Sequence, residues 1–226
     1  MYRLDPDRIL RVPELEAFSW LDHGFGTKHS ADWPREDSRA TLKQIHSTRV
    51  AVARQPGILG EGDALISAEP GLYVAIKTAD CIPVLLLDPD HRAVAAVHAG
   101  WRGTAGNIVR STIDTMVFEF HTNPAALWAA IGPGIRKCCY EVSGEVAAQF
   151  AAWLPQHASP GNGTMLDLTE VNRRQLLEAG LPAEQILGVS GGEWCTRCET
   201  ETLHSFRRDK ESAGRMVSAI RIRPNG

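Results

Sequence analysis

The most constraining feature of this sequence is a series of short apolar segments, several of which follow one another with no helical pattern between them. Each is rich in Val, Ile, Leu or Ala and is bounded by Gly, Pro or Asp, as is typical of β-strands. The predicted strands are Tyr73–Lys77, Val84–Leu87, Ala93–His98, Leu127–Ile131, Gln185–Val189 and Met216–Ile222. Because several are consecutive, we predict an α+β sandwich with a mixed sheet rather than a regular doubly wound fold.

Three other segments have the pattern of helices. Apolar side chains recur near one helical face over Thr104–Phe120. A second helix is predicted over Ser143–Trp153, where the serine is a favourable N-cap, and a third over Leu168–Ala179, which Gly180 would end. The polar stretch Ser159–Thr164 is predicted to be a surface loop, too short to separate domains.

Length and composition limit the class of protein. We expect 226 residues to form one domain over residues 1–226. The net charge of −3 argues against nucleic acid or an anionic membrane as the main partner. The chain has neither a run of roughly 18 apolar residues nor a secretory signal pattern, so we predict a cytoplasmic protein. Its five cysteines then indicate free thiols, metal ligands or a nucleophile rather than disulfides.

The richest candidate site lies at the ends of two predicted strands. In the segment KTADCIP (77–83) a strand breaks into a polar turn that presents Cys81. In VHAGWRG (97–103) a strand ends at His98 and passes through glycines into the predicted helix Thr104–Phe120. Unpaired N–H groups and the dipole of a helix start favour a thiolate or a bound anion, so this arrangement is typical of catalytic sites.

A further histidine, His46, lies upstream in the segment KQIHS (43–47). One Cys and two His with a position left for water would suit a catalytic zinc site. The separations of His46, Cys81 and His98 are much longer than those of zinc fingers, so spacing alone does not identify a metal site. The residue types fit equally a turn-forming His46 and a simply buried Cys81, or a Cys81 nucleophile with one histidine as its base.

Three more residues are predicted to contact the substrate. Arg102 and Arg207 are candidate phosphate ligands, because a guanidinium matches phosphate oxygens in a bidentate way. Asp63, in the segment GDA (62–64), is included with them, although its carboxylate could instead orient a ligand histidine or cap a turn.

The remaining cysteines are weaker candidates. Cys195 and Cys198 have the CxxC spacing, but no second pair of this kind is evident, so they are predicted to be incidental thiols near a turn. Cys138 and Cys139 follow the tight turn Gly132–Gly134, which could line a pocket, and packing is the predicted role of Cys138.

In their order along the chain, several of these segments resemble the laccase-domain (YfiH-type) purine nucleoside phosphorylase family, earlier labelled polyphenol oxidase. The matching segments are KQIH (43–46), GDALI (62–66), KTADCIPV (77–84), HAGWRG (98–103), IGP (131–133) and SFRRD (205–209). TADC followed by HAGWRG is a highly specific combination, and the ordered match runs from about residue 24 to residue 215.

The resemblance implies a single-domain α/β sandwich of the cysteine-hydrolase-like YfiH type. It implies that His46, Cys81 and His98 are the catalytic residues and hold Zn²⁺, with Cu²⁺ as another possible metal. It also implies phosphorolysis of adenosine, inosine and methylthioadenosine, with adenosine deamination as a second activity. The expected partners are then a purine nucleoside and phosphate, not a nucleic acid or a membrane.

Three alternatives stay open at this point. A cysteine-nucleophile hydrolase could act on peptidoglycan precursors, an activity linked to related bacterial proteins. A copper-dependent polyphenol oxidase would need clustered histidines, whereas the eight histidines here are scattered without a His-x-His pair. A non-enzymatic binding module would keep the site only as a structural element. The sequence makes no prediction of the oligomeric state.

Overall fold

The computed structural model describes residues 2–30, 32–157, 163–188 and 193–224, and its strands within these ranges form two large sheets and a two-stranded ribbon. The seven-stranded sheet among these residues has the order β1 (Arg3–Leu4), β2 (Leu10–Arg11), β3 (Leu21–Phe25), β15 (Met216–Ile222), β8 (Tyr73–Thr78), β4 (Arg39–Lys43), β6 (Gly57–Glu61). The six-stranded sheet there has the order β14 (Ile186–Leu187), β11 (Trp128–Ile131), β9 (Ile82–Asp88), β10 (Ala93–Ala99), β7 (Ala64–Ser67), β5 (Val50–Val52). The ribbon pairs β12 (Glu141–Val142) with β13 (Thr164–Met165).

Both large sheets are mixed, which confirms the predicted α+β class. In the seven-stranded sheet β4 pairs in parallel with β6 and β8, while β15 is antiparallel to β3 and β8. In the six-stranded sheet β9 is antiparallel to β10 and β11, and the outer pairs β11–β14 and β5–β7 are parallel. The prediction of a mixed sheet is therefore right in kind, but the described residues contain two such sheets.

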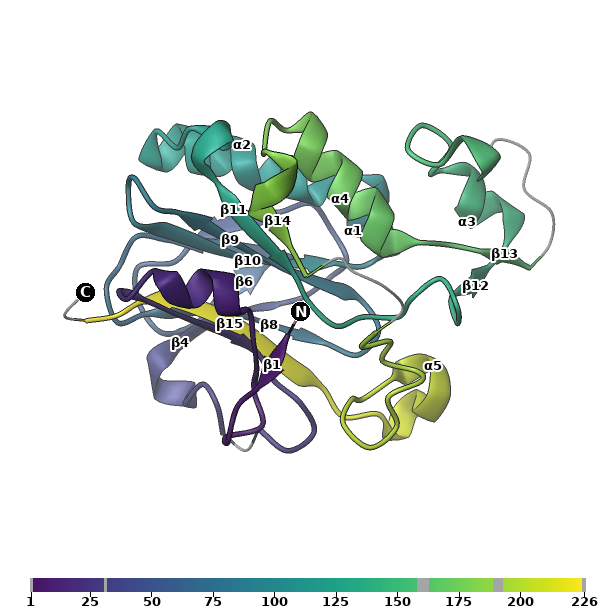
Figure 1. Ribbon diagram of the computed structural model, residues 1–226, viewed down its shortest axis with the longest axis horizontal. Helices are drawn as coiled ribbons and strands as arrows, with labels where there is room; N and C mark the ends of the chain where they lie inside the picture. The colour runs from purple at the N-terminus through teal and green to yellow at the C-terminus, as the bar shows by residue number, and fades with distance from the viewer. Residues whose placement is uncertain (1, 31, 158–162, 189–192, 225–226) are drawn as a thin grey trace.

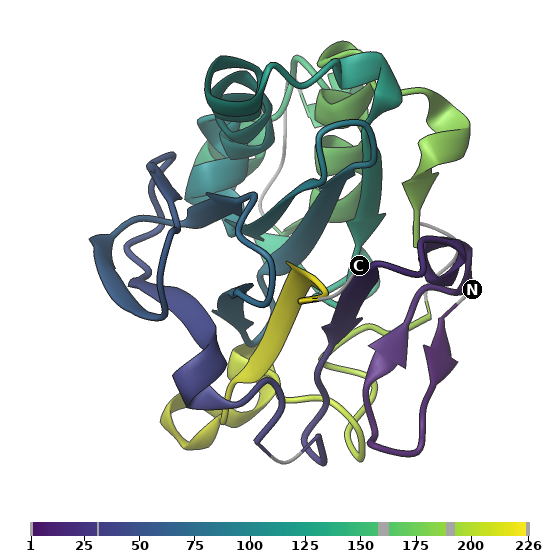
Figure 2. The same ribbon diagram turned by 90° about the vertical axis from the view of Figure 1, so that its left-hand side faces the viewer.

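The longer helices form a third layer on the six-stranded sheet (Figure 1). The α-helices are α1 (Trp101–Ala105), α2 (Ile108–Phe120), α3 (Gly144–Ala148), α4 (Leu168–Glu178) and α5 (Phe206–Asp209). Single 3-10 turns cover Pro13–Ala17, Glu36–Ser38, Pro124–Ala126, Pro155–His157, Ala183–Gln185 and Lys210–Ser212. The long helices α2 and α4 lie over one face of the six-stranded sheet, and the seven-stranded sheet lies against the other (Figures 1 and 2).

This layering explains why the central strands are apolar at nearly every position. Along β9, Val84 and Leu86 pack in the same cluster as the helices, whereas Leu85 and Leu87 pack with residues of the seven-stranded sheet. Successive side chains of a strand point to opposite faces, so a strand between two layers is buried on both. The middle strands therefore form a rigid support, and polar residues are found where they end.

The predicted helix over Thr104–Phe120 is wrong as a single element. The chain forms the short α1, passes through Gly106 and Asn107, and restarts as α2. Asn107 has a left-handed backbone with φ of 62°, which an α-helix does not tolerate and which Asn adopts more readily than most residues. The apolar periodicity correctly located the buried face of α2 but did not detect this break.

The other two helix predictions are confirmed at their starts. Ser143 accepts a hydrogen bond from the backbone N–H of Val146, although α3 ends five residues before the predicted end at Trp153. Helix α4 ends at Glu178, and Gly180 follows with φ of 105°, as expected for a helix stop.

Two predictions fall partly on residues that the structure does not describe. The last predicted residue of the strand Gln185–Val189 lies outside the described residues, and β14 covers only Ile186–Leu187. Most of the predicted loop Ser159–Thr164 lies outside them as well. In the described ranges no helix combines the length and apolar character needed to cross a membrane. The cytoplasmic location stays a prediction.

Candidate active site

Asp63 organises the loop that carries His46. Asp63 lies between β6 and β7, is fully buried, and accepts hydrogen bonds from the backbone N–H groups of Ile45 at 3.3 Å, His46 at 2.9 Å and Ser47 at 2.6 Å. The Ser47 hydroxyl donates to the same carboxylate at 2.7 Å. These bonds hold His46 in a left-handed conformation with φ of 59°, which is uncommon for a residue other than glycine. The position of the His46 side chain is therefore determined by a buried carboxylate from another segment.

The same carboxylate orients His98, the histidine of β10. Asp63 Oδ1 lies 2.8 Å from His98 Nδ1, and His98 is almost completely buried. With Nδ1 occupied in this way, Nε2 of His98 is the ring nitrogen left to bind a ligand. Asp63 thus fixes both histidines, which is the orienting role considered for it from the sequence.

Cys81 reaches the two histidines because β9 and β10 form an antiparallel hairpin. His98 pairs with Pro83, so the turn that carries Cys81 lies at the same end of the hairpin as His98. Cys81 Sγ lies 4.0 Å from His46 Nε2, and the two imidazole rings have centroids 4.9 Å apart. The ligand atoms of all three residues lie within 4.8 Å of one another. The structure therefore brings together the three residues that the sequence places far apart.

The electrostatics of this trio favour a thiolate. Burial alone would raise the pKa of Cys81, but hydrogen bonding to His46 and His98 outweighs it and lowers the pKa to about 6. Burial would lower the pKa of His98, but its hydrogen bonds to Asp63 and Cys81 raise the pKa to about 9. Burial would likewise raise the pKa of Asp63, and its bonds to His98 and Ser47 hold it well below the ordinary range instead. These shifts favour anionic Asp63 and Cys81 beside a protonated His98, and an ion bound by the trio would replace that proton.

A glycine makes the close approach of these residues possible. A Cβ atom on Gly100 would lie 2.9 Å from His46 Cδ2 and 3.0 Å from Cys81 Sγ, closer than such contacts normally are. Gly100 also starts α1, whose five residues are followed by the break at Asn107. The prediction of a helix start beside His98 is confirmed, but that helix is a single short turn.

The trio lines one wall of a cavity of about 580 Å³, a volume in the range of small-molecule sites. The cavity is lined by Leu42, Gln44, His46, Lys77, Ala79, Asp80, Cys81, His98, Tyr140, Phe206, Arg207, Lys210 and Arg215. Besides the trio, this lining combines four basic side chains with two aromatic rings. A site of this kind suits an anionic or phosphorylated molecule that also has a flat ring.

Arg207 is the predicted substrate residue that lies in this cavity. Its guanidinium lies 5.3 Å from the ring centroid of Tyr140 and donates to the backbone carbonyl of Glu141 at 3.0 Å. Its backbone N–H donates to Asp80 Oδ2 at 2.6 Å, and Thr196 donates to the other oxygen of Asp80 at 2.6 Å. Asp80 thus ties the turn of Cys81 to the segments around Thr196 and Arg207.

The other two predicted substrate residues lie elsewhere. Arg102 does not line the cavity and packs over the Trp101 ring at 4.3 Å. Burial raises the pKa of Tyr140, and the positive charge of Arg102 offsets a part of that rise. Asp63 is buried behind the two histidines, with its oxygens bonded as described above. Its position supports the orienting role rather than direct contact with a substrate.

Several lining residues were not selected from the sequence, namely Gln44, Lys77, Tyr140, Phe206, Lys210 and Arg215. Gln44 is held by two hydrogen bonds to the backbone of Lys77, from its amide to the carbonyl at 2.7 Å and to its oxygen from the N–H at 2.8 Å. Phe206 lies in the late SFRRD segment (205–209) and Lys210 directly follows it, so proximity to a motif was the one available signal. Tyr140 had no such signal, because the fold alone brings it opposite the trio.

The structure contradicts two of the expectations for the remaining cysteines. Cys195 and Cys198 do have a partner pair, because their sulfur atoms lie with those of Cys138 and Cys139 within 4.8 Å of one another. Cys138 is exposed, so it does not serve packing. The two pairs come from segments 56 or more residues apart in the chain, which is why spacing did not connect them.

Comparison with known proteins identifies relatives that match most of the chain. The sequence model described as multi-copper polyphenol oxidoreductase laccase matches residues 27–223. A purine nucleoside phosphorylase of Deinococcus radiodurans is 45% identical over 187 residues, covering 81% of this chain and 70% of that protein. The purine nucleoside phosphorylase YfiH of Escherichia coli is 37% identical over 187 residues, covering 79% of this chain and 72% of the relative. The adenosine deaminase RL5, from an unknown prokaryotic organism, is 34% identical over 203 residues, covering 81% and 75% of the two chains.

Solved structures share the fold over nearly the full length. The hypothetical protein YfiH of Bacillus licheniformis superposes with a TM-score of 0.86 at 29% identity, covering 98% of this chain and 99% of the other. YlmD of Geobacillus stearothermophilus also superposes with a TM-score of 0.86, at 28% identity and with 98% of each chain covered.

Proposed function

This chain belongs to the laccase-domain (YfiH-type) family, and from that premise we propose that it is a purine nucleoside phosphorylase with a metal ion held by His46, Cys81 and His98. The observation that carries the proposal is the position of these three donors in the wall of a cavity lined by basic and aromatic side chains. The activities named for the relatives point to the reaction, and the cavity has groups suited to its two substrates.

The donor set fits a zinc ion. Zinc bonds of about 2.3 Å to sulfur and about 2.0 Å to nitrogen place such ligand atoms roughly 3.5 Å apart in a tetrahedron. The distance of 4.0 Å between Cys81 Sγ and His46 Nε2 is close to this value. Asp63 provides the hydrogen bond to a ligand histidine that zinc sites usually have. Three protein ligands leave a fourth position open, as catalytic zinc sites require, and Cu²⁺ would also bind a thiolate and two imidazoles.

When bound, the ion would supply Lewis acidity at the end of the cavity where the trio lies. The chain itself supplies the phosphate site. Lys77, Arg207, Lys210 and Arg215 line the cavity, and basic side chains hold phosphate oxygens through charge-assisted hydrogen bonds. In phosphorolysis, a phosphate oxygen forms a bond to C1′ of the ribose while the bond from C1′ to the purine nitrogen breaks and its electrons leave with the base. Arg207 and its neighbours would position the phosphate for this attack.

The aromatic side chains of the cavity suit the purine base. Tyr140 and Phe206 both line it, and Phe206 is partly exposed, with 39% of its surface accessible. Aromatic rings stack favourably on flat heterocycles. We propose adenosine, inosine and methylthioadenosine as substrates, with adenosine deamination as a second activity, in keeping with the name of the relative RL5.

A second candidate function has its own support in the geometry. Cys81, His98 and Asp63 form a Cys–His–Asp series, with the pKa of Cys81 at about 6, as a nucleophile and an oriented base would require. A hydrolase of this kind would agree with the cysteine-hydrolase-like fold that the family resemblance implies. It would need no metal. Peptidoglycan precursors were its predicted substrates.

The decisive experiment incubates the purified chain with adenosine, with and without phosphate. Adenine and ribose 1-phosphate in equal amounts, formed only when phosphate is present, are the expected products. Inosine formed without phosphate would reveal deamination as a separate activity. The assay is repeated after chelation and after zinc is restored, and activity is expected to fall and then return.

One test variant and one matched control make this result specific. Arg207→Gln removes a cavity cation, whereas Arg110→Gln removes an exposed arginine on α2 that is outside the cavity. The first is expected to raise the KM for phosphate and the second to leave it unchanged. Full phosphorolysis by metal-free protein would contradict the metal part of the proposal, and covalent trapping of Cys81 by a substrate would support the hydrolase instead.

A further inference from the structure

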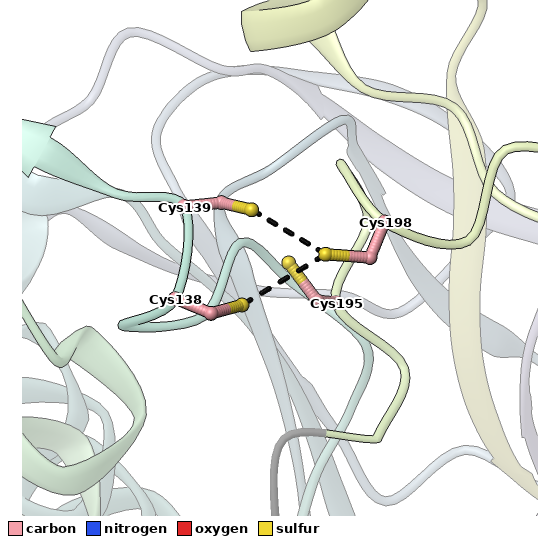
Figure 3. Close-up of side chains that lie close together, drawn as sticks. All are labelled: Cys138, Cys139, Cys195 and Cys198. Atoms are coloured by element: carbon pink, nitrogen blue, oxygen red, sulfur yellow. Dashed lines mark hydrogen bonds between the residues drawn. The ribbon is translucent and has the colours of Figure 1, made fainter.

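Four of the five cysteines form a second cluster away from the catalytic trio. Cys138 and Cys139 lie just before β12, and Cys195 and Cys198 lie in the turn that precedes α5 (Figure 3). The sulfur of Cys198 lies 3.4 Å from that of Cys139 and 3.9 Å from that of Cys138. All four sulfur atoms lie within 4.8 Å of one another. No step of the proposed reaction uses this cluster.

We propose that Cys138, Cys139, Cys195 and Cys198 bind one zinc ion in a closed structural site. Sulfur atoms about 2.3 Å from a zinc ion lie roughly 3.8 Å apart in a regular tetrahedron. Two of the distances between cysteines of different pairs, 3.4 and 3.9 Å, lie on either side of this value. Four thiolates in a tetrahedron are typical of structural zinc, since they leave no position open for a substrate.

Local hydrogen bonds arrange each pair for a shared ligand. The backbone N–H of Cys198 donates to the carbonyl of Cys195 at 3.0 Å, forming a turn that brings both sulfurs to one side. Cys139 donates in the same way to the carbonyl of Arg136 at 2.9 Å. The backbone N–H of Arg136 in turn donates to Cys195 Sγ at 3.4 Å, a contact that favours a thiolate. Backbone hydrogen bonds therefore help to bring the four sulfur atoms together.

The surroundings also accommodate the charge of such a site. Four thiols would release their protons to solvent as four sulfur–zinc bonds form, with no change in oxidation state, leaving a net charge of about −2. The guanidinium of Arg208 donates to the carbonyls of Thr196 and Arg197, at 2.8 and 3.1 Å, within the CxxC turn. A positive charge is thus already placed beside the cluster.

The other functions of clustered cysteines fit less well. A disulfide would join two of the thiols and leave the other two without a role. An iron–sulfur cluster with several irons would need the four sulfurs farther apart, because they must reach different iron atoms. A redox-active CxxC pair normally starts a helix, whereas Cys195 and Cys198 lie in a turn. One metal ion uses all four sulfurs at the distances observed.

The site would join two segments that build the catalytic cavity. Tyr140 directly follows Cys139, and Arg207 lies in α5, shortly after Cys198. Arg207 packs against Tyr140 and donates to the next residue, Glu141. A zinc ion between the two segments would hold this wall in place without touching the substrate. The four cysteines are therefore assigned as structural and positioning residues, not catalytic ones.

Zinc counting on the full chain tests the proposal. The protein is prepared with a thiol-free reductant, equilibrated with Zn²⁺, separated from excess metal and measured by elemental mass spectrometry. Cys81→Ser is used to disable the trio, and this variant is expected to retain about one zinc ion per chain. Adding Cys138→Ser and Cys198→Ser to it is expected to remove that ion. Both substituted side chains are exposed, so the serines themselves should be tolerated.

A cobalt spectrum and a matched control complete the test. Cobalt bound to the Cys81→Ser variant is expected to give the strong thiolate charge-transfer absorption of a four-sulfur site. Lys137→Ala, an exposed change next to Cys138, is expected to alter neither zinc content nor spectrum. In otherwise wild-type protein, the Cys138→Ser and Cys198→Ser changes are expected to lower Tm by on the order of 10 °C.

Three outcomes would overturn the proposal. The first is a Cys81→Ser variant without zinc under reducing conditions, and the second is zinc that persists after the cluster cysteines are replaced. The third is iron in place of zinc in protein purified without added metal. None of these depends on phosphorolysis, so a failure here is distinguishable from a failure of the proposed function.

Discussion

The two sulfur-containing clusters of this protein are supported in different ways. His98 and Cys81 lie at the end of the β9–β10 hairpin, in the middle of a sheet that is buried on both faces, and Asp63 orients both histidines. The four-cysteine cluster lies instead on two loops, with Cys138 and Cys198 exposed. Rigid strands and a buried carboxylate can arrange the first site before any ion binds. The two loops hold the second site less rigidly, so the arrangement of its four sulfur atoms should depend more on the ion.

This difference predicts opposite responses to substitution. Loss of a ligand from the trio should remove activity with little effect on folding, because the sheet supports the site. Loss of a ligand from the four-cysteine cluster should lower stability first and affect activity through the cavity wall. The predictions below test this contrast in order of their expected effect on activity.

The largest effect is expected for His46→Ala. We expect kcat/KM for phosphorolysis to fall more than about 100-fold, beyond the loss that is typical when only a hydrogen-bond partner of a ligand is removed. His46 is exposed on a loop, so Tm should change little. Steady-state kinetics and thermal unfolding of the same preparation check both parts. A large fall in Tm would contradict the view that the sheet and Asp63 support this site independently of its ligands.

Asp63→Asn should have the next largest effect. The carboxylate accepts at both oxygens, with His98 at Oδ1 and the backbone of the His46 loop at Oδ1 and Oδ2, whereas the amide can accept at only one. Either the ring of His98 or the loop of His46 would therefore lose its support. Activity or zinc affinity should fall about 10- to 100-fold. Zinc titration against a competing chelator measures the affinity. An unchanged affinity together with reduced kcat would point instead to His98 acting as a base for Cys81.

Arg207→Gln is expected to act on substrate binding. Loss of one charge-assisted hydrogen bond should raise the KM for phosphate about 10-fold, with a smaller change in kcat. Initial rates at varied phosphate concentration check this. An equal increase in the KM for adenosine would show that Arg207 organises the cavity rather than binding phosphate.

Cys198→Ser should give a smaller kinetic effect than any of these changes. If the four-cysteine site holds the wall formed by Tyr140 and Arg207, KM should increase a few-fold while kcat stays nearly constant, because the trio is untouched. The fall in Tm should be the main consequence. Kinetics well below Tm separate the two effects, and a loss of kcat at that temperature would contradict a purely positioning role.

The smallest effect on activity is expected at His23, a buried residue outside both clusters. Burial and the positive charge of Arg11 lower its pKa to about 4. The unfolded chain therefore takes up a proton first as the pH falls through about 6.5, so the free energy of unfolding should decrease by on the order of 2 kcal/mol between pH 7 and pH 5.

His23→Gln should weaken this pH dependence. Denaturant unfolding at the two pH values, in the presence of chelator, separates the effect of His23 from acid release of zinc at either cluster. An equal slope in both proteins would assign the acid sensitivity to other groups.

Much of the architecture could be read from local pattern. The apolar strands around residues 73–98 and Met216–Ile222 were predicted within one or two residues, because strands buried on both faces contain few polar side chains. The break at Asn107 could not be predicted, since a single left-handed residue leaves the apolar periodicity intact. The pairing of strands into two sheets also depended on contacts between distant segments.

The sequence by itself determined the α+β class, the central strands and, through ordered motifs, the choice of His46, Cys81 and His98. Tertiary structure alone decided that Asp63 lies behind the histidines, that Arg102 packs on Trp101 instead of lining the cavity, and that Cys138 and Cys139 meet Cys195 and Cys198. The physical reason is the same in each case. Periodicity and turn residues report the local backbone, whereas convergence of side chains depends on how sheets and loops pack, which no local pattern specifies.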